Sequence, residues 1–187
     1  MTSSVTAFSE MGHEVEDWPG RLPDTADAWA VLVNSELYSW VHSEYKRNRD
    51  KMNRTLVAAL DAADSYTLND IIAAQTLRTE FNRKIGELLE RFDLLLTPAM
   101  PTEAFSAKGP PPSEIDGRPI PLLGAVAYTY PFNLSGHPAA VVRAGLSSNG
   151  LPIGLQIVGP RHRDDLVLRA ARAFEIARPW NHLWPEL

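Results

Sequence analysis

The 187-residue chain contains no cysteine. This absence excludes disulfide bonds, thiolate metal ligands and a cysteine nucleophile. Basic residues are also too few for a nucleic-acid partner, because 18 basic residues stand against 23 acidic ones and form no basic stripe. No apolar run approaches the length that spans a bilayer, so no membrane partner is expected.

The first residues lack the basic end and the long apolar core of a secretion signal. Together with the lack of cysteine, this predicts a reducing, cytoplasmic location. An apolar content of 44% and a charged content of 22% are those of an ordinary globular protein. The sequence shows no internal repeat and no separate linker, so residues 1–187 are expected to form one unit.

Helical patterns dominate the first half of the chain. A short helix over residues 4–11 should end at Gly12, and a short extended segment should follow over 14–18. Asp24 or Thr25 should cap a long helix, recognised by apolar residues at helical spacing: Trp29, Val33, Leu37, Trp40 and Val41. We expect this helix to give way to a polar, basic stretch over 45–54 and a smaller helical turn over 56–62.

A second long helix should begin at a capping box formed by Thr67 and Asp70. Its apolar stripe consists of Phe81, Ile85, Leu88 and Phe92. A short buried strand over 94–97 should follow and stop at the prolines after it. The many prolines and glycines over 102–121 predict a long loop, a length typical of a functional or mobile cover.

The last part of the chain predicts a short helix over 122–130, a β-hairpin and a final helix. The hairpin strands should cover 139–144 and 153–158, joined through Asn149-Gly150, one of the strongest short turn signals. The second strand has the apolar run of a strand buried on both faces. Asp164 or Asp165 should cap the final helix, and Pro179 should close it.

Candidate chemistry from the residues alone is sparse. Ser43 and Lys46 match the Ser-x-x-Lys spacing of serine acyl-enzymes, but the companion elements of that family are absent. The cluster of His13, Glu14, Glu16 and Asp17 lacks the second histidine at helical spacing that zinc sites use. His137 between Gly136 and Pro138 suits a turn, and His162 suits an exposed position near the last helix. No metal or cofactor is therefore expected.

One stretch carries a specific resemblance: Pro131 to Pro160, which reads PFNLSGHPAAVVRAGLSSNGLPIGLQIVGP. Together with GHEVE near the start and with RTEFNRKIGELLERFDLLLTPAMPTEAF, it resembles the C-terminal part of amidase-signature enzymes. The resemblance covers essentially the whole chain. It implies an α/β fold in which a mixed β-sheet is covered by helices, and a carboxamide as the small-molecule substrate of the intact enzyme.

The same resemblance implies that the chemistry lies elsewhere. The family hydrolyses amides with a serine nucleophile, a second serine held by a cis peptide bond, and a lysine, in regions upstream of everything matched here. This chain has no Gly-Gly-Ser-Ser-Gly-like run, and its four lysines fall outside that context. We therefore assign no catalytic residue and expect the N-terminal catalytic part to be absent and the chain to be inactive alone.

The resemblance does suggest residues for the wall of the substrate pocket. The candidates lie at the strand end and in the following aromatic segment: Thr97, Pro98, Tyr128, Tyr130, Phe132 and Asn133. For each aromatic residue the alternative is packing of a helix onto the sheet, and for Asn133 and Gly136 it is a structural role in a turn.

Two departures bear on the substrate. Val126 stands where the tRNA amidotransferase member of the family has an aspartate near its glutamine site, and Arg143 stands where relatives commonly have proline. A hydrophobic or aryl amide therefore suits the sequence better than glutamine. Arg143 is expected to face solvent or an acidic partner surface.

Three hypotheses remain open from the sequence. The chain is part of an amidase whose catalytic half is lost, cut away or separately encoded; it is a non-catalytic binding or structural module; or it is an acylase that uses Ser43 and Lys46. In the first two cases an exposed sheet edge should favour association with itself or with the missing N-terminal half.

Overall fold

The computed structural model describes residues 2–121 and 123–180, which form two compact units. Met1–Arg21 and Ile85–Leu187 make up the first, here called the sheet unit. Leu22–Lys84 make up the second, here called the helical unit. The boundary falls inside helix α4 (Leu68–Arg91), and each unit is described by itself.

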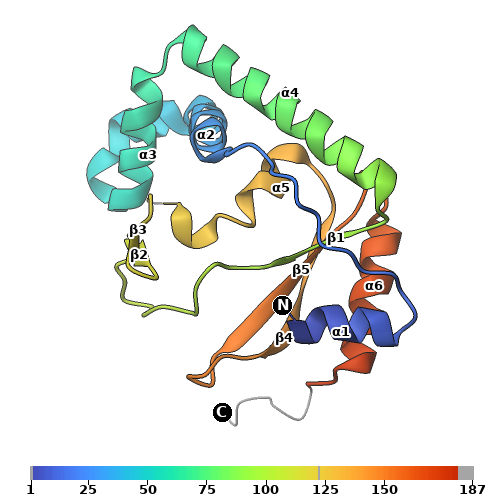
Figure 1. Cartoon of the computed structure of the whole chain (residues 1–187). Coiled ribbons are helices and arrows are strands. Elements are labelled where there is room, and N and C mark those ends of the chain that lie inside the picture. Colours follow the sequence, from blue (N-terminus) through green and yellow to red (C-terminus); the bar gives the residue numbers. More distant parts are fainter. Residues whose placement is uncertain (1, 122, 181–187) are drawn as a thin grey trace. The chain divides into compact units, whose positions relative to one another are not determined.

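A three-stranded antiparallel sheet forms the centre of the sheet unit (Figure 1). Its order is β1 (Leu95–Pro98), β5 (Pro152–Val158) and β4 (Ala139–Leu146), so β5 is hydrogen-bonded on both sides. The predicted strand and hairpin are confirmed. The turn lies at the predicted place, but it is a longer loop in which Ser147 N donates to Leu151 O at 2.8 Å and Gly150 alone of the Asn149-Gly150 pair has a positive φ, 77°.

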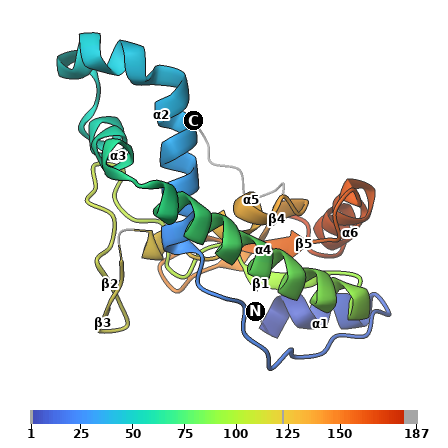
Figure 2. The same cartoon turned by 90° about the horizontal axis from the view of Figure 1, so that it is seen from above.

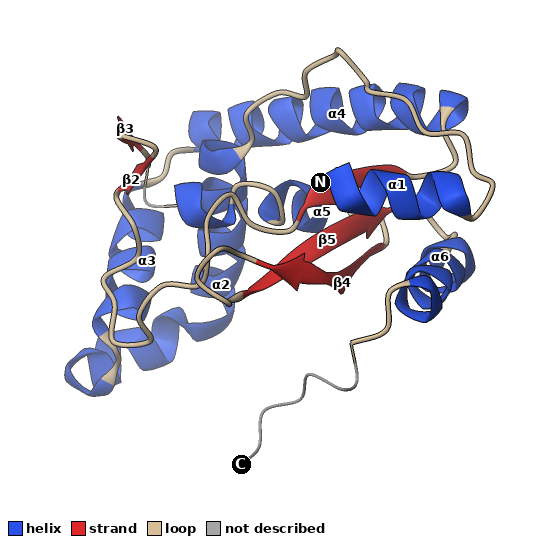
Figure 3. Ribbon diagram, turned by 60° about the horizontal axis from the view of Figure 1, so that its bottom comes forward, coloured by secondary structure: helices blue, strands red, loops and turns tan. Residues whose placement is uncertain are grey.

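Helices α1 (Thr2–Glu10) and α6 (Asp164–Ala177) pack on one face of this sheet, and Figure 3 shows both beside the strands. Leu155 and Ile157 of β5 point to this face because side chains alternate along a strand. Phe8 and Phe174 stack between the two helices with ring centroids 5.7 Å apart. The core of the sheet unit is therefore on the α1–α6 side.

The connection from β1 to β4 differs from its predicted structure. A small hairpin of β2 (Glu114–Ile115) and β3 (Arg118–Pro119) interrupts the expected loop and lies apart from the main sheet (Figure 2). Its turn residues Asp116 and Gly117 have φ values of 49° and 72°. An Asp-Gly pair with positive φ at both residues is a favoured hairpin turn, so a local signal for this hairpin was present in the sequence.

The helix predicted over 122–130 is wrong in position. Residue 122 lies outside the described residues, a 3-10 turn η2 covers Gly124–Val126, and the helix α5 runs over Tyr130–Ser135. Pro131 lies in the first turn of α5, where the missing N–H costs nothing. Gly136 ends the helix in the left-handed conformation at φ 70°, so the turn suggested for Asn133 and Gly136 is a glycine-capped helix end.

The helical unit consists of α2 (Ala26–Asn48), the 3-10 turn η1 (Arg49–Lys51), α3 (Arg54–Ser65) and the first part of α4. The polar stretch expected over 45–54 is helical up to Asn48, because its basic residues lie on an exposed face. Tyr45 is buried and donates its hydroxyl to Asp61 of α3. Arg49 donates to the other Asp61 oxygen at 2.7 Å, so charged hydrogen bonds join α2 and α3.

Helix capping follows the sequence in part. The Thr67–Asp70 capping box is confirmed, with Thr67 N donating to Asp70 Oδ2 at 2.8 Å and Asp70 N donating to Thr67 Oγ1 at 3.3 Å. Asp24 accepts from Ala26 N at 3.0 Å beside the N-cap residue Thr25.

Two expectations at element ends are wrong. Arg163, not an aspartate, is the N-cap of α6, because the first turn begins one residue earlier and already contains Asp164 and Asp165. The extended segment over 14–18 is not one of the strands in the described part of the chain, where no neighbouring strand is hydrogen-bonded to it.

Replacement of Phe174 by alanine should lower the free energy of unfolding by about 3–5 kcal/mol, since a ring that is 1% exposed leaves a cavity against Phe8. Urea denaturation measures this loss. Ile176→Ala on the same helix is the matched control, because that side chain is 64% exposed and its loss should change stability by less than about 0.5 kcal/mol. Equal effects of the two substitutions would contradict the assigned core.

Candidate substrate wall

A buried glutamine lies at the centre of the second face of the sheet. Gln156 is 2% exposed and occupies the middle strand between Leu155 and Ile157, so its side chain points away from the α1–α6 core. Its Nε2 donates to Thr97 Oγ1 at 2.9 Å and to the carbonyl oxygen of Tyr128 at 2.6 Å. One amide group therefore joins the end of β1 to the segment that precedes α5.

The direction of these hydrogen bonds is fixed by their neighbours. Thr97 Oγ1 donates its only proton to Pro98 O at 3.0 Å, so it must accept from Gln156. The Tyr128 carbonyl can only accept. Both protons of the Gln156 amide are thus used inside the protein, and an amide turned over by 180° would place its oxygen against the Tyr128 carbonyl.

The side chains beside Gln156 on this face are small or apolar. Gly154 lies two residues earlier on β5, and a Cβ at this position would lie 2.9 Å from Ala99 Cβ and 2.9 Å from Val141 Cγ1. Val141 pairs with Gln156 across β4 and β5 and is 56% exposed. The candidate substrate wall, called the substrate wall or the wall below, comprises Thr97, Ala99, Tyr128, Val141, Gly154 and Gln156.

Two of the residues suggested by the sequence meet in this wall. Thr97 and Tyr128 are both bound to Gln156, and the Tyr128 side chain is 40% exposed. Tyr130 and Phe132 are buried, which agrees with the packing alternative for these two rings. Pro98 is half-buried between Thr97 and Ala99, and Asn133 is exposed on α5. A substrate role for the six candidates stays a prediction.

A polar cluster of Arg161, Ser135 and His137 lies at the C-terminal end of α5. Arg161, directly after β5, donates through Nε at 3.0 Å and through Nη2 to the carbonyl oxygen of Ser135. Ser135 is buried, and its Oγ lies 2.8 Å from His137 Nδ1. Burial, and then the positive charge of Arg161, lower the pKa of His137 to about 4, so this imidazole is neutral near pH 7.

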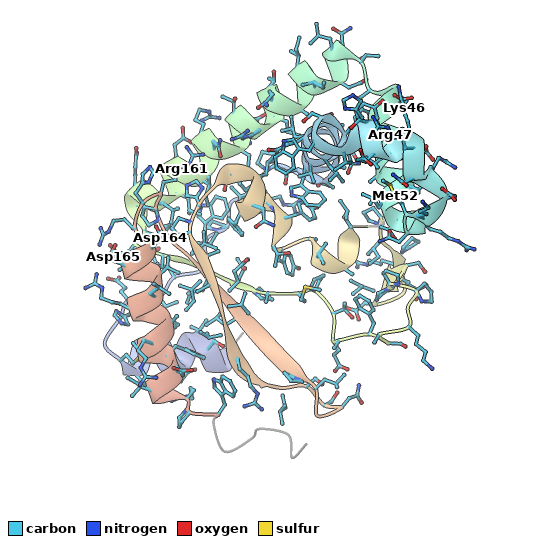
Figure 4. All side chains as sticks on the ribbon, turned by 180° about the vertical axis from the view of Figure 1, so that it is seen from behind. Lys46, Arg47, Met52, Arg161, Asp164 and Asp165 are labelled. Carbon is cyan, nitrogen blue, oxygen red and sulfur yellow. The ribbon has the colours of Figure 1, made fainter. Side chains whose placement is uncertain are left out.

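Sequence reasoning did not select Gln156 or Arg161. A signal for Gln156 exists, because a polar side chain inside a fully apolar strand has to find hydrogen-bond partners when it is buried. Arg161 offers no comparable signal. It follows a proline on an exposed connection, and Figure 4 shows it near Asp164 and Asp165 at the start of α6.

The other sequence candidates gain no support from the geometry. Ser43 and Lys46 are exposed on α2, and no hydrogen bond joins them in the described part of the chain. The ring centroids of His13 and Phe8 lie 5.8 Å apart, and His162 is exposed with a φ of 63°. Within residues 2–121 and 123–180, no group of three or more His, Asp or Glu side chains could hold a metal ion.

Comparison with known proteins establishes the family. The amidase family model matches residues 1–168, and the chain belongs to this family. It corresponds to the C-terminal portion of amidase-signature enzymes, as the sequence motifs indicated, and the α/β fold is confirmed. In the described residues, no helix combines the length and the apolar character needed to cross a membrane.

The curated relatives are longer enzymes. An acylamidase from Rhodococcus erythropolis is 27% identical over 181 residues, which are 95% of this chain and 38% of the relative. A 6-aminohexanoate-cyclic-dimer hydrolase from a Pseudomonas species is 30% identical over 205 aligned residues, which cover 98% of this chain and 41% of that protein. The chain thus spans about two fifths of their length.

Solved structures give the same relation. A bacterial aryl acylamidase of the amidase signature family superimposes with a TM-score of 0.83 and 32% identity, over 97% of this chain and 40% of the other. A 6-aminohexanoate cyclic dimer hydrolase in complex with its substrate superimposes with a TM-score of 0.76 and 26% identity, over 96% of this chain and 40% of the other.

Gln156→Glu should destabilise the protein in a pH-dependent way. The substitution keeps the shape but places a carboxylate against the Tyr128 carbonyl, so burial and this contact should raise the pKa of the new carboxyl group in the folded state. The folded state then binds more protons than the unfolded state, and stability falls as pH rises. We expect a loss of about 2–4 kcal/mol at pH 8 that becomes smaller toward pH 5.

Urea denaturation of wild type and variant between pH 5 and pH 8 measures this difference. Gln156→Leu is the control, because it also removes both hydrogen bonds but cannot ionise, so its loss of stability relative to wild type should not change with pH. A Gln156→Glu difference that is constant across this range would show that the amide does not face the carbonyl.

Proposed function

We propose that this chain forms the C-terminal, substrate-facing part of an enzyme that hydrolyses carboxamides, and that it does not hydrolyse amides alone. The observation that carries the proposal is its extent: the chain belongs to the amidase family but spans about two fifths of its relatives. The family's Ser–Ser–Lys machinery is implied for the remaining portion, and the exposed Ser43 and Lys46 do not replace it.

The role of this chain would be to bind and orient the substrate. Both amide protons of Gln156 and the hydroxyl proton of Thr97 are used within the protein, so the wall offers few free polar groups. Its exposed side chains are the isopropyl group of Val141 and the ring of Tyr128. Such a wall suits the apolar part of a substrate and excludes water from the reacting amide.

These features favour a hydrophobic or aryl amide as the substrate. The aryl acylamidase relative carries an aryl amide in its name, and Val126 stands where the resemblance places an aspartate for glutamine binding. In the reaction, a serine oxygen of the remaining portion would attack the carbonyl carbon and the amine would leave with a proton. Water would then release the acid from the serine ester.

The partner implied by this proposal is a polypeptide that carries the catalytic portion, either covalently continuous with this chain or separate. Self-association of this chain is the alternative occupant of its free sheet edges. Strands β1 and β4 are the edges of the three-stranded sheet, and unpaired edge strands favour association with a further strand.

Co-expression with the N-terminal remainder of an acylamidase relative tests the proposal. The purified complex should hydrolyse an aryl amide such as nitroacetanilide, with release of nitroaniline measured by absorbance. This chain alone and the N-terminal piece alone should show no turnover, because each lacks part of the site. In the complex, Val141→Asp should reduce kcat/KM by at least about tenfold, because it places a charge in the apolar wall.

The other outcomes separate the competing functions. A stable complex without turnover on any amide would favour a non-catalytic binding or structural module. A serine-directed phosphonate that labels this chain alone, with labelling lost in Ser43→Ala, would establish the acylase and overturn the proposal.

A further inference from the structure

The end of helix α5 is held by a side chain that the proposed chemistry does not use. The last carbonyl groups of a helix have no partner within the helix. Gly136 N satisfies the Phe132 carbonyl at 2.9 Å, and Arg161 satisfies the Ser135 carbonyl with two guanidinium nitrogens. Two charged donors on one carbonyl make a stronger and more directional contact than a single neutral hydrogen bond.

Arg161 itself is attached to the sheet through the backbone. Gly159 N, directly after β5, donates to Pro138 O at 3.0 Å, at the start of β4. Pro160 follows and limits the freedom of the chain before Arg161. The guanidinium therefore projects from a fixed point at the end of β5, and its contact transmits that position to α5.

His137 is neutral near pH 7, so the positive charge of this cluster is that of Arg161. Its Nδ1 lies 2.8 Å from Ser135 Oγ, and the imidazole is neutral because burial and Arg161 both disfavour its charged form. A charged imidazole would repel the guanidinium and weaken its bond to the Ser135 carbonyl. The neutral ring instead bonds the Ser135 hydroxyl next to that carbonyl.

We propose that Arg161 is a positioning residue that fixes the C-terminal end of α5, and thereby the Tyr128 side of the substrate wall. The segment from Tyr128 to Ser135 is then held at both ends from β5: Gln156 binds the Tyr128 carbonyl, and Arg161 binds the Ser135 carbonyl. Loss of the second contact frees α5 to move and shifts Tyr128 relative to the rest of the wall. The substrate-binding part of this inference rests on the function proposed above.

Amide hydrogen exchange on the full chain tests the contact without any activity. In Arg161→Gln, exchange over 130–136 should become about tenfold faster than in wild type, the factor that one charge-assisted hydrogen bond is worth. Exchange in α6 should be unchanged. Arg169→Gln is the matched control, because it removes an equal charge from an exposed site on α6. Equal exchange over 130–136 in both variants would overturn the proposal.

The titration of His137 gives a second readout, and Arg161→Lys separates it from general loosening, because loosening would expose the ring and raise its pKa in both variants. Arg161→Gln removes the nearby charge, so the pKa of His137 should rise above its wild-type value of about 4. Arg161→Lys keeps the charge and should leave the pKa low, while its single ammonium group restores the exchange protection only in part. A His137 pKa that is unchanged in Arg161→Gln would show that the guanidinium is not beside the ring. If Arg161→Gln does not fold, the exchange rate over 130–136 in Arg161→Lys tests the contact instead: a rate equal to that of wild type would overturn the proposal.

In the assembled amidase, Arg161→Gln should raise KM for an aryl amide about tenfold with kcat changed less than about twofold, because Arg161 acts on the part of the wall that holds the apolar end of the substrate. An unchanged KM in an active assembly would overturn the positioning role. If the wild-type assembly hydrolyses no amide, the proposed function fails, and the exchange and titration data still decide the contact of Arg161 with α5.

Discussion

A primary amide in the middle strand of a sheet has to find acceptors for both of its protons, because a buried unpaired donor costs about 1–3 kcal/mol. Gln156 meets this requirement with Thr97 on the neighbouring strand and with the Tyr128 carbonyl, 28 residues earlier in the chain. The first partner requires the observed register of β1 and β5. The second requires the segment before α5 to cross this face of the sheet. The arrangement of the wall follows from these two bonds.

The alternation of side chains along β5 separates the α1–α6 core from the wall on the opposite face. Leu155 and Ile157 contact the apolar side chains of α1 and α6, while Gly154 and Gln156 point to the opposite face. A substitution at one of these positions therefore acts mainly on one face. Gly154 shows the limit of this separation: its lack of a side chain lets Ala99 and Val141 approach each other over the middle strand, so the surface is shaped by packing as well as by hydrogen bonds.

The sequence predicted the features that depend on neighbouring residues. The Asn149-Gly150 hairpin, the Thr67–Asp70 capping box and the helix that leads into β1 are encoded within a few residues each. The β2–β3 hairpin had an equally local Asp-Gly signal, which the many surrounding prolines obscured. The family resemblance pointed to Thr97 and Tyr128, but their common partner Gln156 is a contact between distant segments, and periodicity does not show such contacts.

Arg161 illustrates why part of a site escapes sequence reasoning altogether. Nothing in the sequence around Arg161 distinguishes it from an arginine that only faces solvent. Its acceptor is the backbone carbonyl of Ser135, which every residue type has, so the partner cannot be recognised from the sequence either. Gln156 and Arg161 lie five residues apart, yet they bind opposite ends of the segment from Tyr128 to Ser135. The end of β5 thus sets the position of a segment whose own sequence fixes only its helix and its glycine cap.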